Sequence, residues 1–216
     1  EGLACFLPEW MEILKRDVNH PAIIGWCPFN ETQHTQDKRV LRTVWQATKD
    51  FDPTRPCIDT SGNYHVLTDI YDVHDYEQDP AIFKANYDKL MTEGVLFDTV
   101  NSRHPAPRQT YTGGPAFVSE YGGIRWAAGE NDTSKCSSWG YGKDVQGRED
   151  FVNRYKGLTD ALLDNSCMFG LCYTQLTDVE QEQNGIYTYG RGKKFSDESY
   201  ARIRAAQIRK AAYEEE

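Results

Sequence analysis

The sequence predicts an α/β protein built on a parallel sheet, and two observations support this prediction. Segments with the period of an amphipathic helix alternate along the chain with short strand-like segments. Each strand-like segment is apolar through most of its length, which is typical of parallel strands covered on both faces. The chain has 216 residues, 39% of them hydrophobic, enough for one large domain or two small ones.

The individual elements follow from periodicity and from turn-forming residues. Strands are predicted at residues 22–27, 57–60, 67–76, 115–123 and 167–176. Helices are predicted at residues 8–18, 35–51, 80–94, 148–166 and 199–213. Pro8 suits the first turn of the first helix, and residues 125–147 are predicted to form a long loop. Since no linker or repeat divides the chain, we expect one domain over residues 1–216.

The charge balance excludes several kinds of partner. The chain carries 24 basic and 33 acidic residues, a net charge of -9, which repels phosphate backbones and anionic lipid. No apolar run approaches the roughly 20 residues that span a bilayer. We therefore expect neither nucleic acid nor membrane as a partner.

The cysteines predict neither a metal site nor a cofactor. There are six: Cys5, Cys27, Cys57, Cys136, Cys167 and Cys172. They form no C-x-x-C pair and have no histidine at metal-ligand spacing. Cys27, Cys167 and Cys172 lie in or beside apolar runs, so we expect buried, reduced thiols. Reduced thiols favour a cytoplasmic location.

Two predicted strands end on a glutamate. Glu31 closes the segment AIIGWCPFNE, and Glu120 closes PAFVSE. A carboxylate at the end of a buried strand is costly unless it is paired or used, and in parallel α/β folds chemistry collects at these strand ends. Taken singly, each glutamate is explained equally well by a salt bridge or a helix cap. Two carboxylates facing one cleft would be equipped for glycoside hydrolysis.

The segments around these glutamates resemble a known family. Residues 16–31, RDVNHPAIIGWCPFNE, resemble the acid/base strand of glycoside hydrolase family 2, which contains β-galactosidases, β-glucuronidases and β-mannosidases. In that family an Asn-Glu pair closes the fourth strand of a (β/α)8 TIM barrel. PAFVSEYGG resembles its nucleophile strand, the seventh. The resemblance implies that Glu31 is the general acid/base, that Glu120 is the nucleophile and that Asn30 holds the sugar's 2-hydroxyl.

The same resemblance implies further substrate-binding residues. DVHDY matches the sixth strand and would bring His74 and Tyr76 to the cleft, with Tyr76 hydrogen-bonded to the nucleophile. His74 could equally be a wall residue held by hydrogen bonds. GLCYTQLTD resembles the eighth strand, where many relatives place an aromatic side chain under the sugar; here Tyr173 or Gln175 takes that position. Trp126 could stack on substrate or pack within its loop.

By this resemblance the chain contains only the fourth to eighth strands of the barrel with their helices. The first three strands and the N-terminal β-sandwich domains of the family would be missing, and any N-terminal signal would lie upstream. A complete barrel needs about 250 residues. An open half-barrel has unpaired edges, so we expect self-association or pairing with the missing half.

The predicted activity is that of a retaining exo-β-glycosidase acting by double displacement. Relatives that cleave glucuronides carry Asn-x-Lys before the glycine that follows the eighth strand, whereas this chain has Glu182-Gln183-Asn184 before Gly185. This difference predicts a terminal neutral sugar, with a β-galactoside first. The mechanism also requires a protonated Glu31, which the negative charge of Glu120 would favour.

Other functions stay open. The chain could be an inert fragment or a carbohydrate-binding relative without catalysis, or could have β-glucuronidase or β-mannosidase specificity. A dinucleotide-binding domain is disfavoured because the sequence contains no G-x-G-x-x-G motif.

Overall fold

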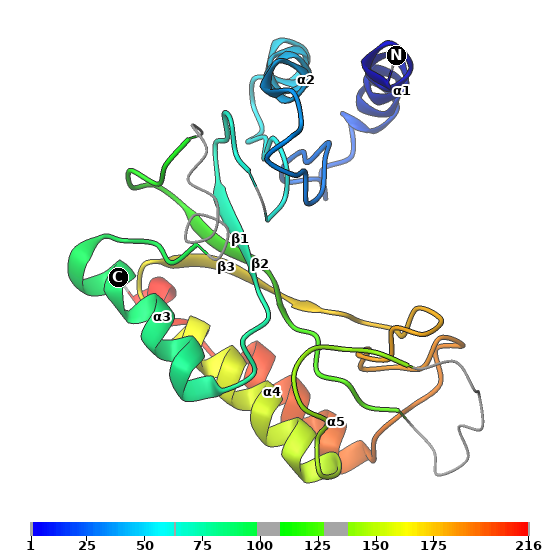
Figure 1. Cartoon of the computed structure of the whole chain (residues 1–216), viewed down its shortest axis with the longest axis vertical. Helices are drawn as coiled ribbons and strands as arrows, with labels where there is room; N and C mark the ends of the chain where they lie inside the picture. Colours follow the sequence, from blue (N-terminus) through cyan, green and yellow to red (C-terminus); the bar gives the residue numbers. More distant parts are fainter. Residues whose placement is uncertain (1, 63, 99–108, 128–137, 216) are drawn as a thin grey trace. The chain divides into compact units, whose positions relative to one another are not determined.

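The computed structural model describes residues 2–62, 64–98, 109–127 and 138–215. In chain order the elements are α1 (Gly2–Asp17), α2 (Lys38–Phe51), β1 (Tyr71–Asp75), α3 (Pro80–Glu93), β2 (Ala116–Gly122), α4 (Arg148–Leu163), β3 (Met168–Thr174), α5 (Asp197–Ile208) and the 3-10 helix η1 (Ala212–Glu215) (Figure 1). They form two compact units. The first unit is Glu1–His74 with Asp98–Phe117, and the second is Asp75–Phe97 with Val118–Glu216.

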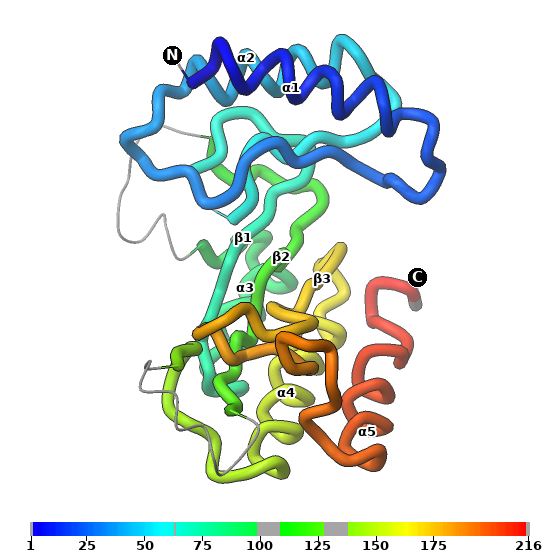
Figure 2. The backbone as a smooth tube through the Cα atoms, turned by 90° about the vertical axis from the view of Figure 1, so that its right-hand side faces the viewer, coloured from blue at the N-terminus to red at the C-terminus, as the bar shows by residue number. Residues whose placement is uncertain are grey.

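The first unit is built on α1 and α2, which lie side by side (Figure 2). The indole N–H of Trp10 on α1 donates to the hydroxyl of Thr48 on α2 at 2.8 Å. Leu14 on α1 forms a buried cluster with Trp26 and Cys57. Burial of this apolar surface is the main favourable term that holds the helices to the segments below them.

The first two predicted strands are present as paired extended segments. Isolated parallel bridges join Trp26 to Cys57 and Asn30 to Ser61. The prediction that residues 22–27 are fully buried is wrong, because Ile24 is 82% exposed while Trp26 is only 5% exposed. Trp26 packs into the cluster under α1, whereas among the described residues no element covers Ile24.

The second unit contains most of a three-stranded sheet with the order β1-β2-β3. Helices α3, α4 and α5 cover one face of β2 and β3 (Figure 1). A hydrogen bond of 2.8 Å between the Tyr121 and Thr159 hydroxyls ties β2 to α4 next to Glu120. Strand β1 is buried throughout, as predicted, but Phe169 on β3 is 44% exposed. The expectation that both faces of every strand are covered is therefore wrong for β3.

Helix boundaries agree with the sequence where local capping residues define them. Helix α3 begins at Pro80 after the cap Asp79, whose side chain accepts from two backbone N–H groups, and it ends at Gly94 with φ 68°. Helix α1 differs, because it begins at Gly2 and contains Pro8 in its interior. A proline there removes one backbone hydrogen bond. The Phe6 ring on α1 stacks on Phe29, with the ring centroids 4.6 Å apart.

The cysteines correct another expectation. Cys27, Cys167 and Cys172 are exposed, whereas Cys57 is fully buried. The apolar runs that contain these three cysteines are covered on one side only, as Ile24 and Phe169 show. Cys136 lies outside the described residues.

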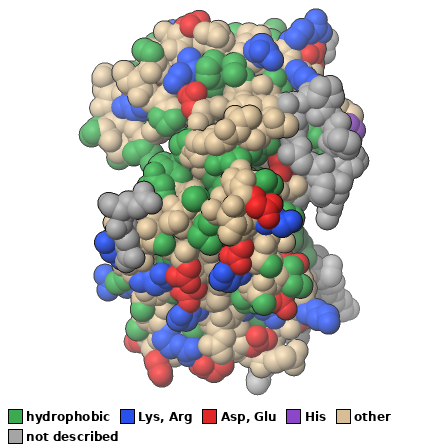
Figure 3. Space-filling view, turned by 90° about the vertical axis from the view of Figure 1, so that its left-hand side faces the viewer, with side chains coloured by type: hydrophobic (Ala, Val, Ile, Leu, Met, Phe, Trp, Pro, Cys, Tyr) green, Lys and Arg blue, Asp and Glu red, His purple; other side chains and the backbone are tan. Residues whose placement is uncertain are grey.

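The surface of the molecule carries both signs of charge, and acidic and basic side chains are intermixed on the face shown in Figure 3. Among the described helices, none combines the length and the apolar character needed to cross a bilayer.

Candidate active site

Glu31 is held at the end of its segment by backbone contacts. Its N–H donates to the carbonyl oxygen of Ser61 at 2.9 Å, and the Ser61 N–H donates to the carbonyl oxygen of Phe29 at 2.8 Å. The φ of Glu31 is 48°, in the left-handed region that residues with a side chain rarely adopt. Such strain persists where the surroundings fix the backbone, and it is common at functional sites. The Glu31 side chain itself is half exposed.

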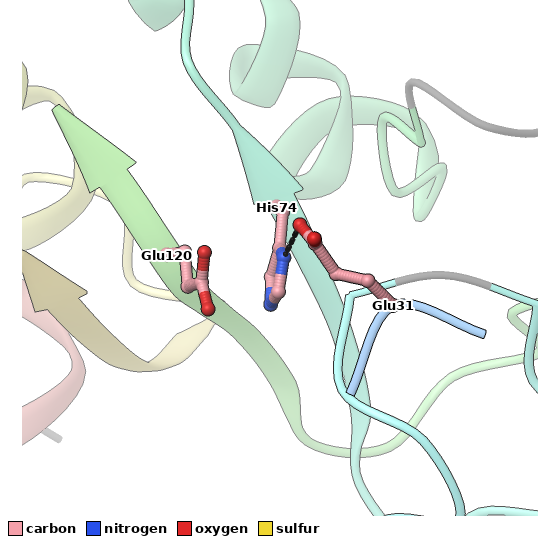
Figure 4. Close-up of side chains that lie close together, drawn as sticks. All are labelled: Glu31, His74 and Glu120. Atoms are coloured by element: carbon pink, nitrogen blue, oxygen red, sulfur yellow. Dashed lines mark hydrogen bonds and ion pairs between the residues drawn. The ribbon is translucent and has the colours of Figure 1, made fainter. Parts of the chain in front are cut away.

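His74 on β1 contacts this carboxylate directly. Its Nδ1 lies 2.8 Å from Oε1 of Glu31 (Figure 4), and its Nε2 lies 2.9 Å from the Ser61 hydroxyl. The hydrogen bond from His74 lowers the pKa of Glu31, although partial burial of the carboxyl opposes this effect. The sequence predicted that Glu31 would stay protonated, which requires a raised pKa. The pKa of Glu31 is lowered instead, because the carboxyl has a histidine partner that was not foreseen.

A buried network of polar side chains, which was not predicted from the sequence, lies behind His74. The Ser61 hydroxyl donates to Asp72 Oδ2 at 2.7 Å. His65 Nε2 bonds to the carbonyl oxygen of Asp72 at 2.8 Å, and His65 Nδ1 lies 2.7 Å from Asp59 Oδ1. His65 and Asp59 are fully buried, and Asp72 is almost fully buried. Such a network is rigid when its members are satisfied.

His65 makes stability depend on pH. Burial opposes its charge, but the hydrogen bonds and charges of Asp59 and Asp72 outweigh burial and raise the pKa of His65 to about 10. Because the folded pKa lies above the unfolded value, this stabilisation is complete below the unfolded pKa and is lost as pH rises through about 10. We expect this one group to lower the free energy of unfolding by about 1.4 kcal/mol per pH unit across that window.

Urea unfolding at several pH values would measure this effect. The slope should be reduced in His65→Gln and retained in the matched control His20→Gln, whose imidazole is exposed. Equal slopes in the wild-type chain and in a folded His65→Gln variant would contradict a charged His65.

The absence of a side chain at Gly62 leaves room for the His74 ring. A Cβ at position 62 would lie 2.0 Å from His74 Cδ2, and the φ of Gly62 is 71°. Gly94 has nearly the same φ, 68°, but nothing within 4 Å of its Cβ position, which makes Gly94→Ala a matched control. We expect both alanine variants to lose about 1 kcal/mol from backbone strain, and Gly62→Ala to lose roughly 1–3 kcal/mol more from the clash. Thermal denaturation of the two variants would test this difference, and equal losses would contradict it.

The second unit holds Glu120, near the carboxyl end of β2 (Figure 4). The Tyr76 hydroxyl donates a hydrogen bond to Oε2 of Glu120, so the predicted contact of Tyr76 with this carboxylate is confirmed. Burial and the neighbouring carboxylate raise the pKa of Tyr76 far above its usual value. Tyr76 therefore keeps its proton and remains a donor to Glu120.

A second tyrosine, which the sequence analysis did not identify, supports Tyr76. The Tyr141 ring stacks on the Tyr76 ring with centroids 3.6 Å apart and planes inclined by 3°. Gly123 permits this arrangement, because a Cβ there would lie 2.4 Å from Tyr141 and 2.9 Å from Tyr76. The Gly-Gly pair directly after Glu120 and Tyr121 was the available sequence signal for a close approach at this point.

A cavity of about 590 Å³ opens beside Tyr76. Its lining includes Gln78, Asp79, Lys143 and Arg154. The lining carries charges of both signs, so it does not indicate one class of ligand.

For the remaining predicted residues, the structure gives less support for a role in substrate binding. Asn30 is exposed and pairs through its backbone with Ser61. Tyr173 packs its ring 4.7 Å from that of Tyr155, and its hydroxyl donates to the backbone of Asn184. These contacts belong to the interior of the second unit, so a role for Tyr173 under a sugar stays a prediction.

Trp126 stacks on Phe195 at 6.4 Å, consistent with packing. Its indole N–H is buried and has no hydrogen-bond partner among the described residues. A contact of Trp126 with substrate stays a prediction.

Comparison with known proteins identifies a family. The family model described as "Glycosyl hydrolases family 2, TIM barrel domain" matches residues 2–198. A search of curated proteins found no match.

Solved structures with a similar fold include several β-glucuronidases. The enzyme of an uncultured Clostridium species has a TM-score of 0.66 and 18% identity, and the match covers 96% of this chain and 36% of that one. The Lactobacillus rhamnosus enzyme has a TM-score of 0.66 and 17% identity, with 97% and 36% covered. A Ruminococcus gnavus enzyme in complex with D-glucuronic acid has a TM-score of 0.65 and 16% identity, with 94% and 36% covered. The chain thus spans about a third of the length of these proteins, and its strands and helices form part of a TIM barrel.

Proposed function

Because the chain belongs to glycosyl hydrolase family 2, we propose that it carries both catalytic carboxylates of a retaining β-glycosidase. Glu120 is the nucleophile and Glu31 is the acid/base. The observation that best supports this proposal is the hydrogen bond from the Tyr76 hydroxyl to Glu120. A donor fixed on a carboxylate orients it, and an oriented carboxylate is what attack on the anomeric carbon requires.

The reaction needs two steps. In the first, the Glu120 carboxylate attacks the anomeric carbon while Glu31 gives a proton to the departing oxygen, which leaves as an alcohol. In the second, Glu31 takes a proton from water, the water oxygen bonds to the anomeric carbon, and the bond to Glu120 breaks. Retention requires the two carboxyl groups to be about 5–5.5 Å apart when substrate is bound.

The residues before Gly185 support our proposal for the sugar class. Glu182 accepts a hydrogen bond of 3.0 Å from the Asn184 side chain, and residues 182–184 contain no cation. A carboxylate here would repel a uronate, so we favour a neutral sugar, with a β-galactoside first. A β-glucuronide is the second candidate, because several solved structures of similar fold are β-glucuronidases.

Mechanism-based labelling tests both points. The full chain would be incubated with 2-deoxy-2-fluoro β-galactoside, β-glucoside, β-mannoside and β-glucuronide donors, and then analysed by intact mass and peptide mapping. We expect an adduct on Glu120, formed fastest with a neutral sugar. An adduct on another residue would refute the assignment of the nucleophile, and selective labelling by the glucuronide would refute the neutral-sugar preference. A folded chain without any adduct would contradict catalysis by this chain alone.

A further inference from the structure

The acid/base role assigned to Glu31 raises a question about its proton. A general acid must hold a proton before it can give one. His74 lies 2.8 Å from Glu31 and favours the ionised carboxylate, so Glu31 by itself is a poor store for that proton. The neighbouring hydrogen bonds show where the proton can be held.

His65 is a fully buried member of the polar network behind His74. Its Nε2 faces the carbonyl oxygen of Asp72, which can only accept, so Nε2 bears a hydrogen. Its Nδ1 faces Asp59, whose oxygens also accept from the N–H groups of Thr60, Val66 and Leu67. Both oxygens of Asp59 therefore act as acceptors, so Nδ1 is the donor in this contact and bears a hydrogen as well. His65 is therefore an imidazolium between two carboxylates.

The tautomer of His74 follows from Ser61. The Ser61 hydroxyl has one hydrogen, which it donates to Asp72 Oδ2, the same oxygen that accepts from the Gly62 N–H at 2.9 Å. Ser61 can then only accept from His74 Nε2, which lies 2.9 Å away, so Nε2 carries a hydrogen. The other ring nitrogen, Nδ1, is left facing Glu31 with the capacity to take up one proton.

We propose that Glu31 and His74 hold the catalytic proton jointly, and that Ser61, Asp72, His65 and Asp59 keep His74 in the Nε2–H tautomer that this sharing requires. The inference rests on the proposed acid/base function of Glu31 and deepens it. His74 and the four residues behind it act through Glu31, so they are positioning residues.

The pair gives up one proton and regains one proton in each turnover. At rest, one proton lies between His74 Nδ1 and the Glu31 carboxyl. When the C–O bond of the substrate breaks, the pair passes this proton to the departing oxygen through Glu31, and the pair is left with a carboxylate and a neutral imidazole. Water then loses a proton to the pair as its oxygen bonds to the sugar, which restores the resting state.

The surrounding charges are compatible with this cycle. In the first unit, Asp72, His65 and Asp59 lie behind the pair, and Cys27 is the titratable side chain on the segment that carries Glu31. His65 compensates one of the two aspartates, so one negative charge remains behind the pair. The other charge in the reaction is Glu120, which is neutralised as an ester in the intermediate.

NMR of the full chain tests the inference without turnover. Histidine labelled with 15N reports the tautomer of each ring, and 13C-labelled glutamate reports the titration of Glu31. In the wild-type chain, above the pH at which the shared proton is lost, we expect hydrogen on Nε2 of His74. In Ser61→Ala, which keeps the backbone contacts of Ser61 to Glu31 and Phe29, we expect a mixture of tautomers. A neutral His74 ring that carries its single hydrogen on Nδ1, in the wild-type chain above that same pH, would overturn the proposal.

A second readout covers the carboxyl. We expect the titration midpoint of Glu31 to move upward in His74→Asn and to stay unchanged in His20→Asn, a histidine exposed on the surface. An unchanged midpoint in His74→Asn would also overturn the proposal. Fluoroglycoside labelling of Glu120 reports on the proposed function separately, so labelling with the wrong tautomer would refute only the shared proton, and the expected tautomer without labelling would refute only the glycosidase activity.

Discussion

Glu120→Gln is expected to abolish hydrolysis of every β-glycoside that the protein cleaves, with kcat lowered by roughly 10⁴-fold or more. An amide of the same shape keeps the contact with Tyr76 sterically possible but cannot attack the anomeric carbon. Because the first bond-forming step is lost, the defect should be as large for activated aryl glycosides as for natural ones. Steady-state rates with aryl glycosides of different leaving groups would measure it.

The control for this change is Glu93→Gln at the exposed end of α3, which alters charge in the same way away from the proposed site. We expect its rates to equal those of the wild-type protein. An unchanged rate for activated aryl glycosides in Glu120→Gln would refute the nucleophile assignment.

The sequence predicted those parts of the structure that local chemistry determines. Helix α3 matches the prediction because Asp79, Pro80 and Gly94 are local start and stop signals. Strand β2 ends within one residue of the predicted end, because Gly122 and Gly123 follow Tyr121 and both adopt positive φ. The contact between Tyr76 and Glu120 was predictable only through the resemblance to a family, since the two residues are 44 positions apart.

Features that depend on distant contacts could not be predicted from one sequence. Nothing in the sequence near His65 indicates that it lies between Asp59 and Asp72, because the arrangement depends on how Asp59 and His65 pack against β1. Similarly, Ile24 belongs to an apolar run but is exposed, because burial depends on which elements pack against a segment. Apolar character shows which side chains can be buried, and tertiary packing decides which of them are.

The contrast between local signals and distant contacts also applies to Glu31, the proposed acid/base residue. Sequence reasoning placed two carboxylates in one mechanism and expected their repulsion to keep Glu31 protonated. The structure adds His74, a partner that favours the charged form of Glu31. If the proposed roles hold, the acid strength of this site is a property of a carboxylate and an imidazole together, and we expect substitution of either residue to affect both steps of the proposed reaction.

Glu31→Ala should therefore have an effect that depends on the substrate. Poor leaving groups, such as alkyl alcohols or a second sugar, need a proton as the C–O bond breaks, so their rates should fall by about 10²–10⁴-fold. Dinitrophenolate leaves without a proton, so formation of the glycosyl-enzyme from a dinitrophenyl glycoside should be nearly unchanged. Its hydrolysis should then become limiting, because no base activates water.

Azide distinguishes the loss of leaving-group protonation from the loss of water activation. It is a nucleophile that needs no base, and in Glu31→Ala the removed side chain leaves space for a small anion beside the sugar. We expect azide to restore turnover of the dinitrophenyl glycoside and to give a β-glycosyl azide, in which two inversions retain the configuration. Glu12→Ala, on the exposed surface of α1, should show neither the loss nor the rescue. An equal loss for good and poor leaving groups without azide rescue would mean that Glu31 supports the fold, since removal of an acid/base catalyst must affect protonation and water activation differently.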